Sequence, residues 1–352
     1  MEGGARDSEA GRRRHALLLA TVQEFIATAE PVGSHQIVSR HPFGVRAAMV
    51  RNMMAELEEA GYLRQPHTSA GRVPTDRAFR YYVDHLMGNP RIGFVDRTQI
   101  ELHYSAEARG LTEVVRDTSR FLALLTGQVA LVTAPRLDDV VLERVSFVRL
   151  RAHEVLAIFV AVAGKGSAQN RLVQADQDFS QEELDRMARY LNESLQGRSL
   201  DEARRWIEER LHEDRARYDG FMRAALALGG AIAGRPAPAE VYVEGSAKVA
   251  DQPEFTDHNR LRELLRTLED RTALLDLLER SFAKDGLTVS IGSENFDARL
   301  ASLSIVATSY QSGAMPLGSL AIVGPVRMDY ERLIPLVNYT ARALSRRLEP
   351  SS

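Results

Sequence analysis

The sequence has no cysteine among its 352 residues, which excludes disulfide bonds and zinc sites built on cysteine thiolates. Long apolar runs are also missing. The longest aliphatic stretch, residues 155–163, is far too short to cross a bilayer, and the first residues of the chain lack the apolar core of a signal peptide. We therefore expect a cytoplasmic protein that has no membrane partner.

A strong charge of either sign is lacking as well, because the net charge is −3. The distribution is more informative. Residues 1–80 contain 11 arginines and 9 acidic residues, a balance of +2, and the remainder has a balance of −5. Because the positive charge of residues 1–80 is small, the electrostatic attraction of one chain to nucleic acid is limited. This favours a dimer, which doubles the phosphate contacts. The three arginines at residues 12–14 form either an arm that touches phosphate or a solvated tail.

Motifs of catalytic chemistry are scarce. The histidines are scattered, and none lies in an HExxH pattern that would hold a metal. The stretch Gly164–Ser167 resembles a phosphate-binding loop but lacks the upstream glycine of that motif, so we interpret it as a hairpin turn. Glu294 and Asn295 either line a small pocket or, as we expect, satisfy the backbone of their own loop. We therefore expect that the protein is not an enzyme, nor an enzyme that carries a DNA-tethering domain. We also expect no metal or cofactor.

Residues 45–84 are the most informative part of the chain. Apolar residues recur there at helical spacing and predict a helix over residues 46–61 with one buried stripe of Val50, Met53, Met54 and Leu57. The opposite side carries Ala48, Arg51 and Asn52. A small residue lets a helix approach the floor of the major groove, while arginine pairs bidentately with guanine and asparagine pairs with adenine. The alternative is an ordinary amphipathic helix with solvated polar residues.

The flanking segments favour DNA binding over that alternative. Upstream, residues 18–29 have the pattern of a first helix, and Ser34 is expected to cap a short second helix. Downstream, two short strands enclose a polar turn at residues 66–71, and Thr75 is expected to cap the next helix. The hairpin has the character of a wing that reaches phosphate or a minor groove through His67, Thr68, Ser69 and Arg72. A plain surface hairpin is the alternative.

The middle of the chain alternates between helix and strand patterns. We expect a linker at residues 88–100, a helix over 107–125, and strands over 128–133, 140–150, 155–162 and 171–175. Helices are expected over 180–195 with a Ser180 cap, over 200–218 and over 221–232. The last helix is so apolar that it is either buried core or a subunit interface. Its candidate interface residues are Phe221, Met222, Leu226, Leu228 and Ile232.

After the proline-containing residues 236–238 the pattern changes to that of an α+β sheet. We expect a strand over 241–244, a single amphipathic helix over 260–282, and three strands over 288–291, 301–309 and 318–323. A last helix over residues 330–347 is expected to begin after Asp329, whose carboxylate can cap it.

The sequence resembles one family in three separated regions. Similarity to the heat-inducible transcription repressor HrcA is carried by EPVGSHQIVSR, RNMMAELEEAGYL, PHTSAGRVPTDRAFRYYVD, VYVEGSAKVADQPEF, VSIGSEN and GSLAIVGPVRMDYERLIPLVNYTARAL. The resemblance spans nearly the whole chain apart from its first dozen residues. One departure concerns the recognition helix, where the family often has Ser, Pro and Thr and this chain has Arg46, Ala47 and Met49. Because good capping residues are lost there, we expect a different helix start or base preference.

The resemblance implies an α+β multidomain fold. It implies an N-terminal winged helix-turn-helix over residues 1–88, a GAF-like α+β domain over 89–139 and 236–352, and an inserted α+β dimerisation domain over 140–235. The residues expected to contact DNA are Ser34, Arg46, Ala48, Arg51, Asn52, His67, Thr68, Ser69 and Arg72.

The resemblance also implies a homodimeric repressor of chaperone genes that is cytoplasmic and nucleoid-associated. It would bind double-stranded DNA at an inverted-repeat operator of the CIRCE type, and the chaperonin GroEL would keep it active. The alternative is a winged-helix regulator whose GAF-like domain senses a small molecule. A polar-lined cavity near Glu294 would favour that alternative.

Overall fold

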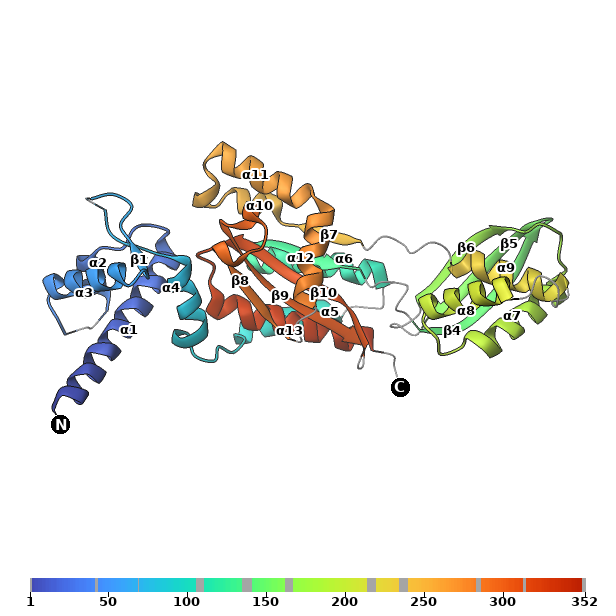
Figure 1. Cartoon of the computed structure of the whole chain (residues 1–352), viewed down its shortest axis with the longest axis horizontal. Coiled ribbons are helices and arrows are strands. Elements are labelled where there is room, and N and C mark those ends of the chain that lie inside the picture. Colours follow the sequence, from blue (N-terminus) through green and yellow to red (C-terminus); the bar gives the residue numbers. More distant parts are fainter. Residues whose placement is uncertain are drawn as a thin grey trace.

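The computed structural model describes residues 2–41, 44–68, 70–105, 111–134, 141–161, 167–213, 220–233, 240–282, 286–312 and 315–349. They form an N-terminal helical unit, a central unit built on a five-stranded sheet, and a unit inserted between two strands of that sheet (Figure 1). The mixed α+β class predicted from the sequence is confirmed. None of the described helices is long and apolar enough to span a membrane.

The N-terminal unit contains α1 (Glu2–Thr28), α2 (Ser34–Arg40) and α3 (Ala47–Glu59). A hairpin of two antiparallel strands follows, β1 (Leu63–Arg64) and β2 (Val73–Pro74), and then α4 (Asp76–Tyr81), which continues as one π-helical turn, η1 (Tyr82–Leu86). Thr75 caps α4 as predicted, because its hydroxyl accepts the Ala78 N–H. The arm or tail expected at residues 12–14 is wrong, since these arginines belong to α1.

The central unit opens with α5 (Phe94–Ser105) and α6 (Leu111–Thr126). The linker expected over residues 88–100 is therefore too long, because its last seven residues are helical. Gly127 ends α6 with a φ of 68°, a left-handed conformation that suits glycine. After the sheet strands, the chain closes with α13 (Tyr330–Leu348), and Asp329 caps it by accepting the Arg332 N–H, as predicted.

The central sheet has the strand order β7-β3-β10-β9-β8, and every neighbouring pair is antiparallel. Its members are β3 (Val129–Thr133), β7 (Val241–Glu244), β8 (Thr288–Ile291), β9 (Leu303–Ser312) and β10 (Met315–Pro325). Alternate residues face opposite sides. Ala130 and Ile322 belong to the apolar layer under α6 and α13, whereas Val129 and Val323 belong to the layer under α11 and α12. Helices thus cover both faces.

The helices between β7 and β8 are α10 (Ser246–Ala250), α11 (His258–Glu269) and α12 (Arg271–Phe282). The single helix expected over 260–282 is wrong. The chain breaks at Asp270, whose ψ of 83° is not helical, and the Asp270 carboxylate accepts the Ala273 N–H at 3.1 Å. The carboxylate caps α12 and also pairs with Arg299 at 3.1 Å. The apolar spacing continues across this break, and therefore conceals it.

The inserted unit lies in sequence between β3 and β7. Its sheet has the order β4-β5-β6, from β4 (Leu142–Arg151), β5 (Glu154–Ala161) and β6 (Ser167–Gln174). Its helices are α7 (Gln181–Leu195), α8 (Leu200–Glu213) and α9 (Gly220–Ala233), and Ser180 forms the expected cap as a full capping box with Glu183. The turn expected at Gly164–Ser167 lies largely outside the described residues.

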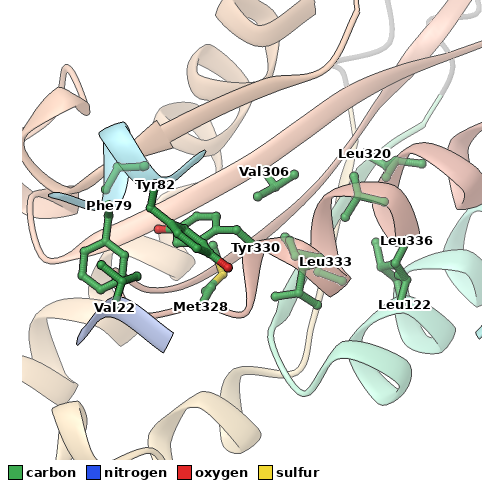
Figure 2. Packing of buried hydrophobic residues seen from close by; sticks show 14 of the residues in the cluster. Val22, Phe79, Tyr82, Leu122, Val306, Leu320, Met328, Tyr330, Leu333 and Leu336 are labelled. Carbon is green, nitrogen blue, oxygen red and sulfur yellow. The ribbon is translucent and has the colours of Figure 1, made fainter. Parts of the chain in front are cut away.

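An aromatic cluster joins the N-terminal unit to the central unit. Phe79 and Tyr82 lie against Tyr330 and Met328 at the start of α13, and the same apolar layer continues through Leu333 into the sheet (Figure 2). The rings of Phe79 and Tyr330 are 6.1 Å apart. Burial raises the pKa of Tyr82 to about 12. Since these side chains share one core, the N-terminal unit is docked on the central unit.

Polar contacts surround this cluster. The Arg80 guanidinium donates to both carboxylate oxygens of Glu294, at 2.8 and 2.5 Å, and to the Val289 carbonyl at 2.7 Å. The Ser293 N–H donates to the Asp76 carboxylate at 2.8 Å. Burial alone raises the pKa of Glu294, but hydrogen bonds from Arg80 and from the Ile291 N–H outweigh it, and the pKa is lowered.

Replacing Glu294 by Gln tests this docking contact. We expect the free energy of unfolding to fall by about 1 kcal/mol at neutral pH, the value of a charged hydrogen bond discounted for partial exposure of both groups. Because the folded-state pKa of Glu294 is lowered, the wild-type advantage is complete above the unfolded-state pKa and disappears as the pH falls through the folded-state pKa. Urea unfolding at several pH values measures it. A difference that persists undiminished in acid contradicts the assignment.

Candidate nucleic-acid interface

Helix α3 presents one face to solvent and the other to the core. Val50, Met54 and Leu57 are buried and Met53 is half-buried, as the predicted stripe requires. On the outer face Arg46, Ala48, Arg51 and Asn52 are exposed, and Met49 is 50% exposed. The predicted reading residues therefore lie together on one accessible surface, which has the residue types that contact base edges in a major groove.

Helix α2 is fixed to α1 by one buried carboxylate. Glu24, whose side chain is only 11% exposed, accepts hydrogen bonds from Gln36 at 3.0 Å and Arg40 at 2.6 Å, and His41 Nε2 lies 3.3 Å away. Burial raises the pKa of Glu24, but these three hydrogen bonds outweigh it and lower the pKa. An ionised Glu24 holds the short helix against the long one, and so sets the angle at which α3 follows.

The start of α3 shows the consequence of the departure noted in the sequence. Arg46 is the N-cap residue, with extended backbone angles, but its side chain makes no capping hydrogen bond. The helix still begins at Ala47, and the backbone carbonyl of Arg46 accepts from Met49 and Val50. An arginine at this position projects a cation beside the reading face instead of satisfying the first N–H groups.

The wing is braced from within. The Gln65 side chain donates to the Thr68 and Ala70 carbonyls at 3.1 and 2.9 Å. At its base, Val32 and Arg72 exchange two backbone hydrogen bonds of 2.9 Å. Gly71 lies so close to Val32 that a Cβ atom there would be 2.5 Å from the Val32 backbone. His67 and Thr68 are exposed at the tip, whereas Ser69 lies outside the described residues.

Two expected DNA contacts have other roles in this structure. The Arg72 side chain is 14% exposed and its Nε donates to Glu58 at 2.9 Å, so it ties the wing to α3 and is not available to phosphate in this arrangement. Ser34 is 8% exposed and is the first residue of α2. The cap predicted at Ser34 is wrong, since Gly33 is the N-cap residue and no side chain bonds there.

Sequence patterns missed the residues that hold this surface in shape. Glu24, Glu58 and Gln65 are polar residues at positions where the sequence pattern predicts exposure to solvent. Irregular turns separate them from their partners. Glu58 is the most important of these, because its two oxygens take Arg72 and the Gln65 N–H. The opposite charges of Glu58 on α3 and Arg72 just before β2 offer a weak signal.

Comparison with known proteins decides the family. A family model described as the HrcA protein C terminal domain matches residues 112–334. A heat-inducible transcription repressor HrcA from Geobacter sulfurreducens is 40% identical over 342 residues, which are 97% of this chain and 99% of that protein. The protein of the same name from Sorangium cellulosum is 37% identical over 336 residues, 95% of this chain and 96% of its own length.

The chain belongs to the HrcA family. It is accordingly a heat-shock transcription repressor, as its resemblance to the family in several sequence motifs predicted. A solved structure described as a hypothetical protein has a TM-score of 0.60 with it, at 24% identity and with 95% of this chain and 96% of that chain covered. The HrcA fold described above is therefore shared by an experimental structure.

Replacing Arg46 by Ser should restore the missing cap of α3. We expect the free energy of unfolding to rise by about 1 kcal/mol, because a serine hydroxyl accepts one of the unpaired N–H groups of the first turn. Arg46→Ala is the matched control, since it removes the same cation without adding an acceptor. Denaturant unfolding compares the three proteins, and an equal gain from alanine would show that charge and not capping is responsible.

Proposed function

We propose that this HrcA protein represses by binding an inverted-repeat operator as a homodimer, with α3 in the major groove. The exposed face of α3 carries this proposal, because it places Arg51 and Asn52 side by side on an otherwise anchored helix. The order of three helices, a two-stranded hairpin and a further helix supports a winged helix-turn-helix. His67 and Thr68 at the wing tip are the candidates for phosphate contacts, and Arg46 is a third.

The remaining proposed contacts differ in kind. Ala48 and Met49 offer apolar contact to a thymine methyl group, and the small Ala48 allows close approach. Ser34 and Arg72 act by holding α2 and the wing in place, in view of their burial. We further propose that the central unit is a GAF-like domain and that the inserted unit mediates dimerisation. A dimer would match its two reading helices to the two halves of the operator.

We propose that dimerisation does not use the apolar helix named from the sequence as a candidate interface. Leu226 and Leu228 on α9 are 1% and 4% exposed within a single chain, where they pack on α7 and α8. Phe221 and Met222 are half-buried, and the Ile232 side chain lies outside the described positions. The apolarity of α9 thus reflects burial in the core of its own unit, which was the other interpretation of the pattern.

The uncovered face of the inserted sheet is the better dimer surface. Strand pairing aligns Val148, Leu156 and Leu172 in one row across β4, β5 and β6. Val148 is 39% exposed and Leu172 is 55% exposed, and Leu150 beside them is 51% exposed. The helices α7 and α9 cover the opposite face. When the same aliphatic face of a second copy packs against it about a two-fold axis, the contact is self-complementary.

Operator binding by base contacts is tested with Arg51→Ala and Asn52→Ala. Each should cost about 1–3 kcal/mol on the operator and little on random DNA, because base contacts carry sequence information and phosphate contacts do not. Arg262→Ala, an exposed arginine on α11, is the control and should change neither affinity. Fluorescence anisotropy across a salt series measures both. Equal weakening on operator and random DNA would show that Arg51 is only a phosphate contact.

The dimer surface is tested by Leu172→Lys. A charge in the middle of the aliphatic row should weaken self-association at least tenfold, at a cost of about 1.4 kcal/mol or more, while leaving the inserted unit folded. Leu226→Ala is the matched variant, because it should destabilise folding by about 2–5 kcal/mol through a core cavity. Sedimentation velocity and thermal unfolding are measured on both. Unchanged self-association of Leu172→Lys refutes this surface.

We also propose that GroEL maintains the active repressor by binding the inserted unit before it is packed. The segments 155–163 and 221–232 are the apolar runs of that unit, and Val155, Ala157, Ala225 and Leu226 share its buried cluster. These four side chains are accessible only when the unit is open. Heat-unfolded proteins that occupy the chaperonin would then lower the amount of active repressor. Adding GroEL should raise operator binding, and an unfolded competitor should reverse the gain. Full binding without chaperonin, unaffected by competitor, contradicts this feedback.

A further inference from the structure

A cavity of about 560 Å³ lies at the junction between the N-terminal and central units. One wall comes from the base of the wing and the start of α4, including Arg64 and Arg77. The other comes from the central unit, including Glu254, Ser293 and Ser302. Glu294 is not among the lining residues, and its carboxylate accepts from Arg80 and from the Ile291 N–H. The volume falls in the range of small-molecule sites.

The acidic groups of this cavity are already satisfied by the protein. The Glu254 carboxylate pairs with the Arg327 guanidinium, and the Asp76 carboxylate accepts the Ser293 N–H at 2.8 Å. Ion pairing neutralises Arg327 in turn. The Ser293 N–H is a neutral donor, so Asp76 keeps its negative charge.

The cationic groups are not balanced in the same way. Arg77 donates to the neutral Ala60 carbonyl at 2.9 Å and lies over the Tyr62 ring, and neither contact cancels its charge. Arg64 is exposed and pairs with no acidic residue in the described part of the chain. The two positive charges of Arg64 and Arg77 exceed the single negative charge of Asp76, so the lining carries a net positive charge.

The remaining lining combines the polar side chains of Thr75, Ser293 and Ser302 with apolar ones. Phe79 and Phe255 are buried behind it, at 1% and 3% exposure, and Phe25 and Val326 complete that side. A site with an apolar floor and an excess of guanidinium groups at its rim suits an amphipathic anion, since the apolar body is removed from water while the head group meets arginine.

We propose that the junction cavity binds a small organic anion, a carboxylate or phosphate head group on an apolar body, and that binding favours the docked arrangement of the two units. The ligand site itself does not depend on the proposed function, whereas its effect on operator binding rests on it. A ligand that contacts both walls binds the docked form more tightly than an undocked one, and so stabilises it. Since the recognition helix belongs to one of these units, operator affinity then depends on the ligand.

The site is tested by calorimetric titration of the full-length protein with benzoate, with phenyl phosphate, and with inorganic phosphate as the head group alone. We expect saturable binding of one molecule per chain for at least one aromatic probe, at least tenfold tighter than inorganic phosphate. Whichever of benzoate and phenyl phosphate binds more tightly shows whether the site prefers a carboxylate or a phosphate head group. Absence of saturable binding by both aromatic probes overturns the proposal, as does equal binding of inorganic phosphate.

Three variants assign the site to the cavity. Ser302→Phe places a ring in the cavity and should abolish binding, whereas Ala298→Phe, at an exposed position outside the lining, should leave it unchanged. Arg77→Gln removes a charge and should weaken binding at least tenfold, and it serves if Ser302→Phe does not fold. Wild-type affinity in Arg77→Gln and in a folded Ser302→Phe overturns the assignment.

Coupling to DNA is measured separately, by operator titration with and without a saturating aromatic probe. A change of threefold or more in operator affinity in wild type, absent in Arg77→Gln, supports the coupling, and no change overturns it. Because probe binding is measured without DNA, failure of the cavity and failure of operator binding are distinguished.

Discussion

The structure depends on the buried contact that docks the N-terminal unit on the central unit. Phe79 and Tyr82 come from the segment just after the wing, and Tyr330 and Met328 from the segment that leads into the last helix. The Tyr330 hydroxyl is itself satisfied by Ser304 and the Val326 carbonyl, both at 2.7 Å, so the ring is buried without an unpaired polar group. Helix α3 belongs to the unit attached in this way, and so it has a fixed orientation relative to the sheet, which a flexible linker would not give it.

The docked arrangement has a consequence for the proposed dimer. The outer face of α3 lies at one end of the central unit and the inserted sheet at the other (Figure 1). A dimer formed through the inserted unit would therefore set the separation of the two reading helices through two central units and two docked junctions. Loss of packing in any of these parts alters that separation, and half-site binding requires a particular separation. Under the proposed function, marginal stability of one unit is sufficient for heat to lower the amount of DNA-competent dimer, without a dedicated heat-sensing residue.

Local patterns in the sequence predicted the elements that satisfy local rules. The Ser180 and Asp329 caps have partners within three residues, and the strand over Thr288–Ile291 has its own apolar and turn pattern, so capping chemistry and periodicity reveal them. The break at Asp270 was missed because the apolar spacing runs through it. The start of α1 was missed because its first residues have no apolar stripe.

The exposed residues of α3 and the residues that hold α3 and the wing together also differ in how far the sequence predicts them. The exposure of Arg51 and Asn52 follows from helical spacing alone. The roles of Arg72 and Glu58 depend on which long side chains meet after the wing has folded back, and no local pattern encodes that. The apolarity of α9 was correctly recognised, but whether such a helix packs inside its own unit or against a partner depends on the strands beside it. Those strands left a different face uncovered.

A distance distribution within one chain tests the rigid junction most directly. The chain has no cysteine, so spin labels can be attached specifically to cysteines introduced at Glu59 on α3 and Ala298 in the central unit, both exposed. Labelled protein is mixed with an excess of unlabelled protein, so that a dimer contains at most one labelled chain. Pulsed electron spin resonance of this pair should then give one narrow distance peak, and adding Tyr330→Ala should broaden it. A broad distribution in the otherwise unmodified protein would contradict the docked arrangement, since it would show that the reading unit moves independently of the sheet.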